Sequence, residues 1–443
     1  MTWRRFLQAG SLLLAGVLVL HGFFGPDFAP RNLATLAVWV HTRGLLVLAL
    51  LAFGNAFCLA CPFTLARDLA RKLSAPVRRW PRAWRSKAPA LLLFALVLFV
   101  YERCALWSSP PATAGLILAY FAGAILVDVN FKGAPFCKWL CPLGQFNFAG
   151  AALSPFEVAA KDLSVCASCR TKDCLRGRRD EGGNVTLRGC ETGLFLPRKV
   201  GNMDCTFCMD CVAACPEDNA GLVLRMPGAE LVDDRWRSGV GRPSERPDLA
   251  ALSVVFLFGA LLNAYAMTAP AFALAERLSF GLRSETLTLT VMFTVGLVLL
   301  PAAVLLGAAA LSRGSEPLVK TALRFSPALI PLGLGVWTAH YGFHFLTGAG
   351  TLVPAVQAVV EDLSGFEFLG RPLWGLGGLS PMAAQGIGQG VLALGLVGSL
   401  AAAWRQGQGL KASWPWLLVC AVLWGAGAWV LSQPMAMRGV AVG

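Results

Sequence analysis

Residues 205–216 read Cys-Thr-Phe-Cys-Met-Asp-Cys-Val-Ala-Ala-Cys-Pro, so that Cys205, Cys208, Cys211 and Cys215 are separated by two, two and three residues. This spacing is typical of iron–sulfur ligation, in which three close thiolates bind one four-iron cubane and the fourth cysteine binds a second cluster. A zinc site would instead need two Cys-x2-Cys pairs separated by a longer stretch. The run therefore predicts a small module that is held together by iron–sulfur clusters.

A second, looser group of cysteines lies upstream, where Cys166-x2-Cys169-x4-Cys174 is followed after a long excursion by Cys190. Because the fourth ligands are exchanged in two-cluster modules of this kind, the spacing predicts two complete [4Fe–4S] sites. Zinc or an altered cluster is the alternative for the upstream group. The predicted ligand sets are Cys166, Cys169, Cys174 and Cys215 for one cluster, and Cys190, Cys205, Cys208 and Cys211 for the other.

The rest of the chain is too apolar for a water-soluble enzyme. Of 443 residues, 56% are hydrophobic and 14% charged, with a mean hydropathy of +0.61, whereas an ordinary globular domain has about 25% charged residues. Apolar runs near 20 residues in length, enough to cross a ~30 Å hydrocarbon core, predict nine membrane spans. These runs cover about 6–24, 35–57, 88–107, 113–130, 249–268, 285–311, 321–347, 383–404 and 414–432.

Basic residues indicate which loops face the cytoplasm, because Lys and Arg near span ends are retained on that side. They crowd the 62–87 loop and flank the insert at 131–248. We therefore expect both segments and the N-terminus on the cytoplasmic side of a bacterial inner membrane, and the C-terminus on the outer side. This retention explains the net charge of +13, so nucleic acid is not expected as a partner.

The predicted fold class is mainly α, a polytopic helical membrane protein of about nine spans with an inserted cytoplasmic double-cluster module. Its predicted parts are a four-helix membrane region at 1–130, the cysteine-rich module at 131–248 and a five-helix membrane region at 249–443.

Two further cysteine pairs share one pattern. Phe-Cys58-x2-Cys61-Pro follows the second predicted span, and Phe-Cys137-x3-Cys141-Pro follows the fourth. Proline commonly opens a helix, so we expect these thiols near helix N-termini, where thiolate is favoured, as redox or metal ligands. Buried structural cysteines are the alternative. The remaining cysteines lack partners and are interpreted as packing residues: Cys104 and Cys420.

Over roughly residues 35–220, these motifs resemble the membrane polyferredoxins of the NapH and NosR type. Cys137-x3-Cys141-Pro142 and the 205–216 run match that pattern, whereas the Cys58 motif is one residue short. The resemblance implies a [4Fe–4S] membrane electron-transfer protein that combines Cys-Pro motifs at helix ends with a cytoplasmic ferredoxin module. Such proteins connect the quinone pool or cytoplasmic donors with periplasmic reductases of respiratory chains.

All four histidines are predicted toward the outer ends of spans: His21, His41, His340 and His344. His340 and His344 lie on one helix face but about 6 Å apart along the axis, so a second helix has to supply any opposite ligand. Ionisable residues inside spans mark functional sites by default, and imidazole is a common ligand of haem iron and other metals. We therefore expect a site for haem b, a metal or a quinone here, with histidines bonded to interfacial carbonyls as the alternative.

The expected function is electron transfer between cytoplasmic-side [4Fe–4S] clusters and the quinone pool or a periplasmic-side redox partner. Because the clusters carry the electrons, no side chain is expected to act as a general acid or base. The enzymatic activity that the protein could have is quinol–quinone oxidoreduction. Expected partners are membrane lipid, quinone and a periplasmic or membrane redox protein. The alternative is an assembly or regulatory ferredoxin, similar to the CcoG group, that reduces copper or disulfides for another oxidoreductase.

Overall fold

The computed structural model describes residues 2–312, 316–407 and 409–435. The chain forms two compact units. Unit 1 contains residues 1–12, 49–93 and 121–252, and unit 2 contains residues 13–48, 94–120 and 253–443. All cysteines of the predicted cluster and Cys-Pro motifs belong to unit 1, and all four histidines belong to unit 2.

The protein is mainly helical, as the sequence predicted, with 71% of the described residues in helices. Its α-helices are α1 (Thr2–Phe24), α2 (Leu33–Thr35), α3 (Arg43–Phe53), α4 (Ala56–Leu59), α5 (Pro62–Leu73), α6 (Ala88–Arg103), α7 (Pro110–Asn130), α8 (Pro142–Gly150), α9 (Leu163–Ser168), α10 (Asp173–Arg176), α11 (Asp210–Ala214), α12 (Pro247–Tyr265), α13 (Ala269–Leu282), α14 (Glu285–Thr294), α15 (Leu300–Ser312), α16 (Leu318–Phe325), α17 (Ile330–Thr347), α18 (Leu352–Ser364), α19 (Pro381–Gly407) and α20 (Leu410–Ser432). Short π-helical turns include η2 (Leu36–Thr42) and η5 (Phe136–Leu140).

Among the described residues, seven helices are long and apolar enough to cross a membrane, or up to eight if one bent pair counts as a span. The predicted number of nine spans is therefore not confirmed. One difference is α6, which has 16 residues where a span needs about 20. The other is the bent pair itself, because the helical run Leu318–Thr347 turns by 56° into Ala349–Ser364.

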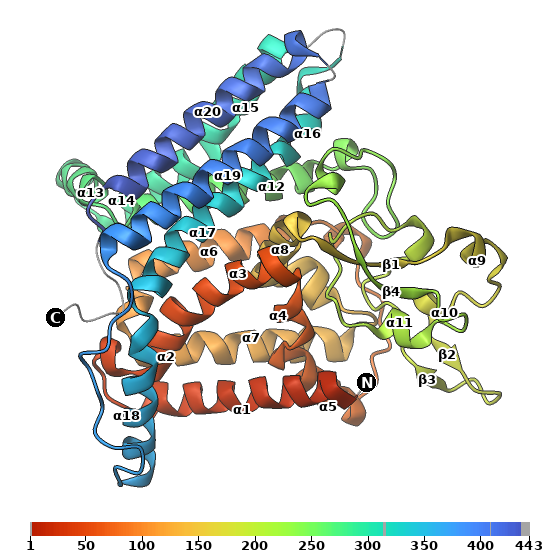
Figure 1. Cartoon of the computed structure of the whole chain (residues 1–443), viewed down its shortest axis with the longest axis horizontal. Helices are drawn as coiled ribbons and strands as arrows, with labels where there is room; N and C mark the ends of the chain where they lie inside the picture. The colour runs from red at the N-terminus through yellow and green to blue at the C-terminus, as the bar shows by residue number, and fades with distance from the viewer. Residues whose placement is uncertain (1, 313–315, 408, 436–443) are drawn as a thin grey trace. The chain divides into compact units, whose positions relative to one another are not determined.

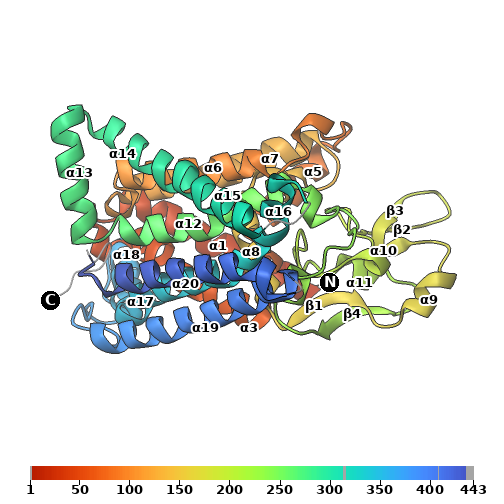
Figure 2. The same cartoon turned by 90° about the horizontal axis from the view of Figure 1, so that it is seen from above.

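The insert of unit 1 contains little regular structure. Strand β1 (Phe156–Ala160) pairs antiparallel with β4 (Ala220–Leu224), so that residues about 60 positions apart lie opposite each other. A second short pair joins β2 (Arg178–Arg179) to β3 (Val185–Leu187). Both views place these strands together with α9, α10 and α11 (Figures 1 and 2). The β1–β4 pair closes the insert into a loop that carries the eight cysteines between residues 166 and 215.

In unit 2, helix α17 packs against α19, which packs against α20 (Figures 1 and 2). Glycines allow the close approach: a Cβ atom on Gly395 would lie 2.9 Å from the carbonyl oxygen of Pro331. Small residues commonly bring helices together in this way where lipid removes the hydrophobic driving force. The segment between α12 and α14 contains helix α13.

Candidate functional site

Four cysteines of the insert line one cavity and are here named group A: Cys166, Cys169, Cys174 and Cys215. The first three come from α9, the following loop and α10, whereas Cys215 follows α11. Asn219 supports this group, because its side-chain amide lies 3.3 Å from Cys166 Sγ and its backbone N–H donates to Cys215 Sγ at 3.4 Å. The structure therefore brings Cys215 to the upstream cysteines, as ligand exchange predicts.

A second set of neighbouring cysteines, group B, consists of Cys190, Cys205, Cys208 and Cys211. Burial raises the pKa of Cys205, Cys208 and Cys211, and for each of them the nearby Cys190 adds to the rise. The surrounding loop contains three non-glycine residues with left-handed backbone: Asp204, Phe207 and Met209. Because such conformations are sparsely populated and persist only when the surroundings hold them, the packing around the loop fixes its backbone.

The two Cys-Pro motifs meet around a single cavity, and their cysteines are named group C: Cys58, Cys61, Cys137 and Cys141. Pro62 and Pro142 begin α5 and α8, as the sequence predicted, so Cys61 and Cys141 are the N-cap residues. The Gly144 N–H donates to Cys141 Sγ at 3.2 Å. The Asn147 side-chain amide lies 3.4 Å from Cys58 Sγ. Two motifs that are about 80 residues apart thus form one four-cysteine site.

The expectation that these helix N-termini favour thiolate is not met by the bare protein. Burial raises the pKa of Cys58 to about 12, and it also raises the pKa of Cys61, Cys137 and Cys141. Backbone hydrogen bonds at the N-termini lower the pKa of Cys61 and Cys141 but do not outweigh burial. A thiolate in this cavity therefore needs a strong positive charge beside it.

The three groups are neighbours in the order A, B, C. A further cavity is lined by two cysteines of group B, Cys190 and Cys208, and by two of group C, Cys58 and Cys137. On the other side, the backbone N–H of Cys190 in group B donates to the carbonyl oxygen of Cys174 in group A at 2.9 Å. Group B therefore lies between groups A and C.

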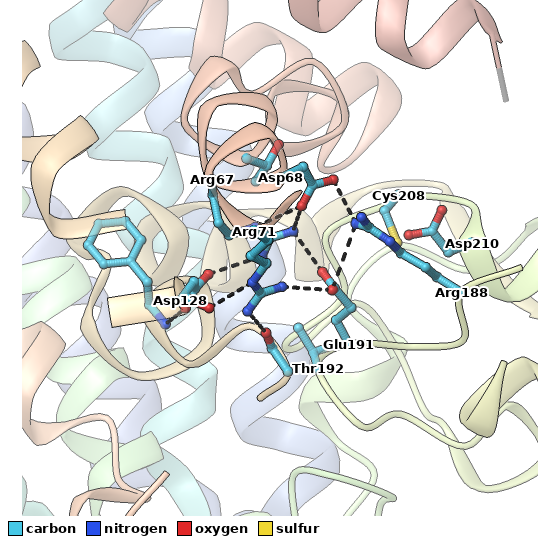
Figure 3. A network of polar contacts seen from close by, with 12 residues as sticks. Arg67, Asp68, Arg71, Asp128, Arg188, Glu191, Thr192, Cys208 and Asp210 are labelled. Atoms are coloured by element: carbon cyan, nitrogen blue, oxygen red, sulfur yellow. Dashed lines mark hydrogen bonds and ion pairs between the residues drawn. The ribbon is translucent and has the colours of Figure 1, made fainter. Parts of the chain in front are cut away.

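Arg67 on α5 is buried beside groups B and C, with 4% of its surface exposed. Its Nη1 donates to Asp128 Oδ2 at 3.0 Å, and its Nη2 donates to Glu191 Oε2 at 2.7 Å (Figure 3). Arg67 and Asp128 both line the group C cavity, while Glu191 directly follows Cys190 of group B. The guanidinium thus connects the surroundings of two cysteine groups.

The network extends along α5 (Figure 3). Arg71 Nη1 donates to Glu191 Oε1 at 3.0 Å, and Arg188 Nη1 donates to Asp68 Oδ2 at 2.6 Å. Although burial raises the pKa of Asp68, the cations of Arg67 and Arg188 lower it below its ordinary value. The Asp68 carboxylate is therefore ionised at neutral pH and compensates the buried Arg67.

A second buried ion pair also joins groups B and C. Lys87, which is 1% exposed, donates through Nζ to Asp204 and, at 3.0 Å, to the carbonyl oxygen of Lys138. Asp204 directly precedes Cys205, and Lys138 directly follows Cys137. Asn55, next to the Cys58 motif, adds a 3.0 Å hydrogen bond from its side-chain amide to the Cys205 carbonyl oxygen.

The sequence did not identify these charged residues as part of a site. Arg67 and Lys87 belong to the basic 62–87 loop. Retention of basic loops on the cytoplasmic side already accounts for such residues, so the sequence gives no reason to expect ion-pair partners for them. Two local signals were present: Glu191 and Asp204 are acidic residues directly adjacent to predicted cluster ligands, in a chain with only 25 acidic residues.

The four histidines lie in unit 2, on α1, η2 and α17. His21 uses both ring nitrogens: Leu33 N–H donates to Nδ1 at 3.1 Å, and Nε2 lies 3.1 Å from Asp362 Oδ2. His41 Nε2 lies 3.2 Å from Thr351 Oγ1. These contacts agree with the alternative interpretation, in which His21 and His41 make structural hydrogen bonds and bind no cofactor.

His340 and His344 are both buried on one face of α17, with ring centroids 5.0 Å apart. The His41 ring packs edge-on against Phe345 at 6.0 Å, so η2 adjoins this part of α17. The arrangement keeps His340 and His344 as a candidate site for haem, a metal or a quinone headgroup, with His41 nearby.

Replacing His340 or His344 singly with alanine is expected to remove a cofactor bound at this site and to slow quinol-linked reduction of the clusters, because each imidazole would be a direct ligand. Visible spectra of the purified protein and reduction rates in liposomes measure both effects. Thr347→Ala, on the same helix, is the control. Wild-type spectra and rates in both histidine variants would make the histidines structural.

Within the part of the chain that the structure describes, no group of three or more His, Cys, Asp or Glu side chains converges as a single metal ion requires. The four thiols of group A and of group C each surround a cavity. Of the remaining cysteines, Cys104 is exposed and Cys420 is buried, and they belong to unit 2.

Comparison with known proteins identifies a 4Fe-4S binding domain at residues 32–82 and 113–147. The matched segments contain all four cysteines of group C. The ferredoxin-type protein NapH of Escherichia coli is 26% identical over 209 residues, which cover 44% of this chain and 67% of NapH. A protein of Methanocaldococcus jannaschii without an assigned function is 25% identical over 175 residues, which cover 38% of this chain and 64% of that protein.

The chain thus spans about two thirds of the length of each of these relatives. No solved structure matches it significantly. The apolar helices agree with a multi-pass membrane protein, and the matched domain supports iron–sulfur clusters as cofactors. The family model and the relationship to NapH together support a NapH-like polyferredoxin family for this chain.

Proposed function

We propose that the protein is a membrane-bound iron–sulfur electron-transfer protein. In this proposal, electrons pass between groups A, B and C and the quinone pool or a periplasmic-side redox partner. The observation that carries the proposal is the order of the cysteine groups: three sets of four thiols adjoin one another within unit 1. An ordered set of neighbouring redox centres is what electron transfer over a long distance requires.

Groups A and B are proposed to bind one [4Fe–4S] cluster each, as the ligand exchange predicts. Group C is proposed to bind a third iron–sulfur centre, since its four cysteines are those of the segments that match the 4Fe-4S family model. Bound clusters would supply one-electron redox chemistry. The chain's own contribution is to hold the thiols at fixed positions, to exclude water from group C and to compensate charge through Arg67 and Lys87.

The basic residues flanking the insert favour an orientation with groups A and B on the cytoplasmic side of a bacterial inner membrane. A soluble donor would then meet group A first, and group C would pass electrons to a carrier within the membrane. The histidines of unit 2 are the candidate site for that carrier. The relative named NapH is a ferredoxin-type protein, which agrees with this role.

The iron content of the anaerobically purified protein tests the proposal. We expect about twelve iron atoms per chain, four for each group, and about eight in a Cys141→Ser variant, with the electron paramagnetic resonance signals of two centres retained. Cys104→Ser, an exposed cysteine outside all three groups, is the control. About eight iron atoms in both the wild type and Cys141→Ser would restrict cluster binding to groups A and B.

Quinol-linked reduction of the clusters in liposomes distinguishes the proposed role from assembly. If quinol does not reduce the clusters but the reduced protein reduces copper or a disulfide, the protein is an assembly ferredoxin, and the electron-transfer proposal is wrong.

A further inference from the structure

Unit 1 contains a large open cleft, about 570 Å³ in volume, that belongs to none of the cysteine cavities. It lies where two candidate membrane helices end: α7 ends at Asn130 just before Lys132, and α12 begins at Pro247 just after Arg246. The loop between α5 and α6 lies beside the end of α7, where the Lys132 N–H donates to the Arg78 carbonyl oxygen at 2.9 Å, and it adds Arg79, Trp80 and Arg85 to the lining. The cleft therefore adjoins the ends of two candidate membrane helices, which is where lipid headgroups surround a spanning helix.

The charge of the cleft is strongly positive. Arg79, Arg85 and Lys132 are exposed side chains that line it. In the described parts of the chain, the side chains of Arg79 and Lys132 make no hydrogen bond or ion pair, and Arg85 donates to the Trp80 carbonyl oxygen at 3.1 Å. The acidic residue of the lining is Glu191, whose two carboxylate oxygens already accept bonds from Arg67 and Arg71. Among the described residues, the side chains of Arg79 and Lys132 are thus not neutralised by a carboxylate.

Tryptophans accompany these cations. Trp236 is 55% exposed, and Trp80 is half-buried, with its ring packed edge-on against Phe131 at 5.0 Å. Trp80 Nε1 also donates to the Trp84 carbonyl oxygen at 3.0 Å, which fixes the ring. Tryptophan is enriched at the membrane–water interface, because its ring is apolar and its N–H is polar.

We propose that this cleft is a binding site for the headgroup of an anionic phospholipid. The exposed cations would bind the phosphate, and Trp80 and Trp236 would contact the glycerol and the upper acyl chains. Basic pockets at the ends of membrane helices are suited to such headgroups. Lys138 and Glu191, which directly follow Cys137 and Cys190, also line the cleft, so the bound lipid would stabilise the wall between groups B and C.

Native mass spectrometry of the full-length protein, released from nanodiscs that contain equal amounts of phosphatidylglycerol and phosphatidylcholine, tests this site. We expect the wild type to retain phosphatidylglycerol selectively. The double variant Arg79→Glu/Lys132→Glu should lose that lipid by about 30-fold or more, since each basic residue near an anionic surface contributes roughly a factor of five. Lys72→Glu/Arg82→Glu is the matched control, because both of these exposed cations lie outside the cleft lining.

Equal retention of the two lipids by the wild type would overturn the proposal, whether or not the variant folds. Unchanged phosphatidylglycerol binding by Arg79→Glu/Lys132→Glu would also overturn it. Displacement of the lipid by inorganic phosphate at millimolar concentration would reassign the cleft to a soluble phosphate. Iron content, measured in the same samples, shows that the variants are folded.

Discussion

Replacing Cys208 with alanine is expected to remove the group B cluster and to unfold much of the insert. The insert has short strands, so the proposed clusters would supply a large part of its folding free energy when bound. Cys208 lies in the loop with left-handed backbone, and its carbonyl oxygen accepts a 2.6 Å hydrogen bond from Arg4. We expect a loss of at least about four iron atoms per chain and rapid proteolysis between β1 and β4.

The same variant should also disturb group A, since the chain segments that carry the two groups are interleaved through Cys190 and Cys215. Electron paramagnetic resonance spectra, iron analysis and limited trypsin digestion report the two effects separately. Cys104→Ala serves as the control, because this cysteine is exposed and lies in unit 2. A Cys208→Ala protein with full iron content and wild-type protease resistance would contradict the proposed ligand set.

The grouping of Cys215 with the upstream cysteines could be predicted from the sequence because ligand spacing is a local property. The spacing of the 205–216 run predicts that Cys215 binds a different cluster from Cys205, Cys208 and Cys211. In the structure, Cys215 lines the same cavity as the other cysteines of group A. The pairing of the two Cys-Pro motifs into one cavity was not predicted. It depends on how α5 and α8 pack, which neither motif encodes by itself.

The partners of the buried charges could not be predicted for a different reason. A basic residue near a membrane helix has a sufficient explanation in topology, so its sequence position does not reveal whether it is also paired. Arg67 and Asp128 are 61 residues apart and contact each other through the packing of α5 against the end of α7. Such contacts follow from tertiary structure alone.

The number of spans shows the limit of hydropathy. The apolar run at 88–107 is continuous in sequence, yet helix α6 ends at Arg103, and the following Ala105 adopts a left-handed backbone. The run at 321–347 continues into a bend at Gly348. Mean hydropathy is insensitive to both events, since neither changes the apolar content of the window.

Replacing Arg67 with methionine is expected to destabilise unit 1 by about 3–5 kcal/mol, the range for removal of one partner from a buried ion pair. Asp128 is fully buried, and the lost guanidinium would leave its carboxylate without its 3.0 Å ion pair. Arg82→Met, an exposed arginine of the same basic segment, should change stability by less than about 0.5 kcal/mol. Unfolding in mixed detergent micelles measures the difference.

A double variant separates the charge effect from a simple loss of packing. Asp128→Asn removes the orphaned charge, so Arg67→Met/Asp128→Asn should recover part of the stability that Arg67→Met loses, with a positive coupling in the double-mutant cycle. Additive losses would show that Arg67 acts through its aliphatic contacts alone.

Arg67 should also affect the redox properties of group C. Reduction adds a negative charge to a cluster, and a buried cation that lines the same cavity stabilises the reduced form. At an effective dielectric constant near 20, one charge several ångströms away contributes roughly 2 kcal/mol, which is on the order of 50–100 mV. We therefore expect Arg67→Met to lower the reduction potential of group C, while Arg67→Lys keeps it close to the wild-type value. A redox titration that is followed by electron paramagnetic resonance measures the shift, and an unchanged potential in Arg67→Met would mean that this charge stabilises the fold without acting on electron transfer.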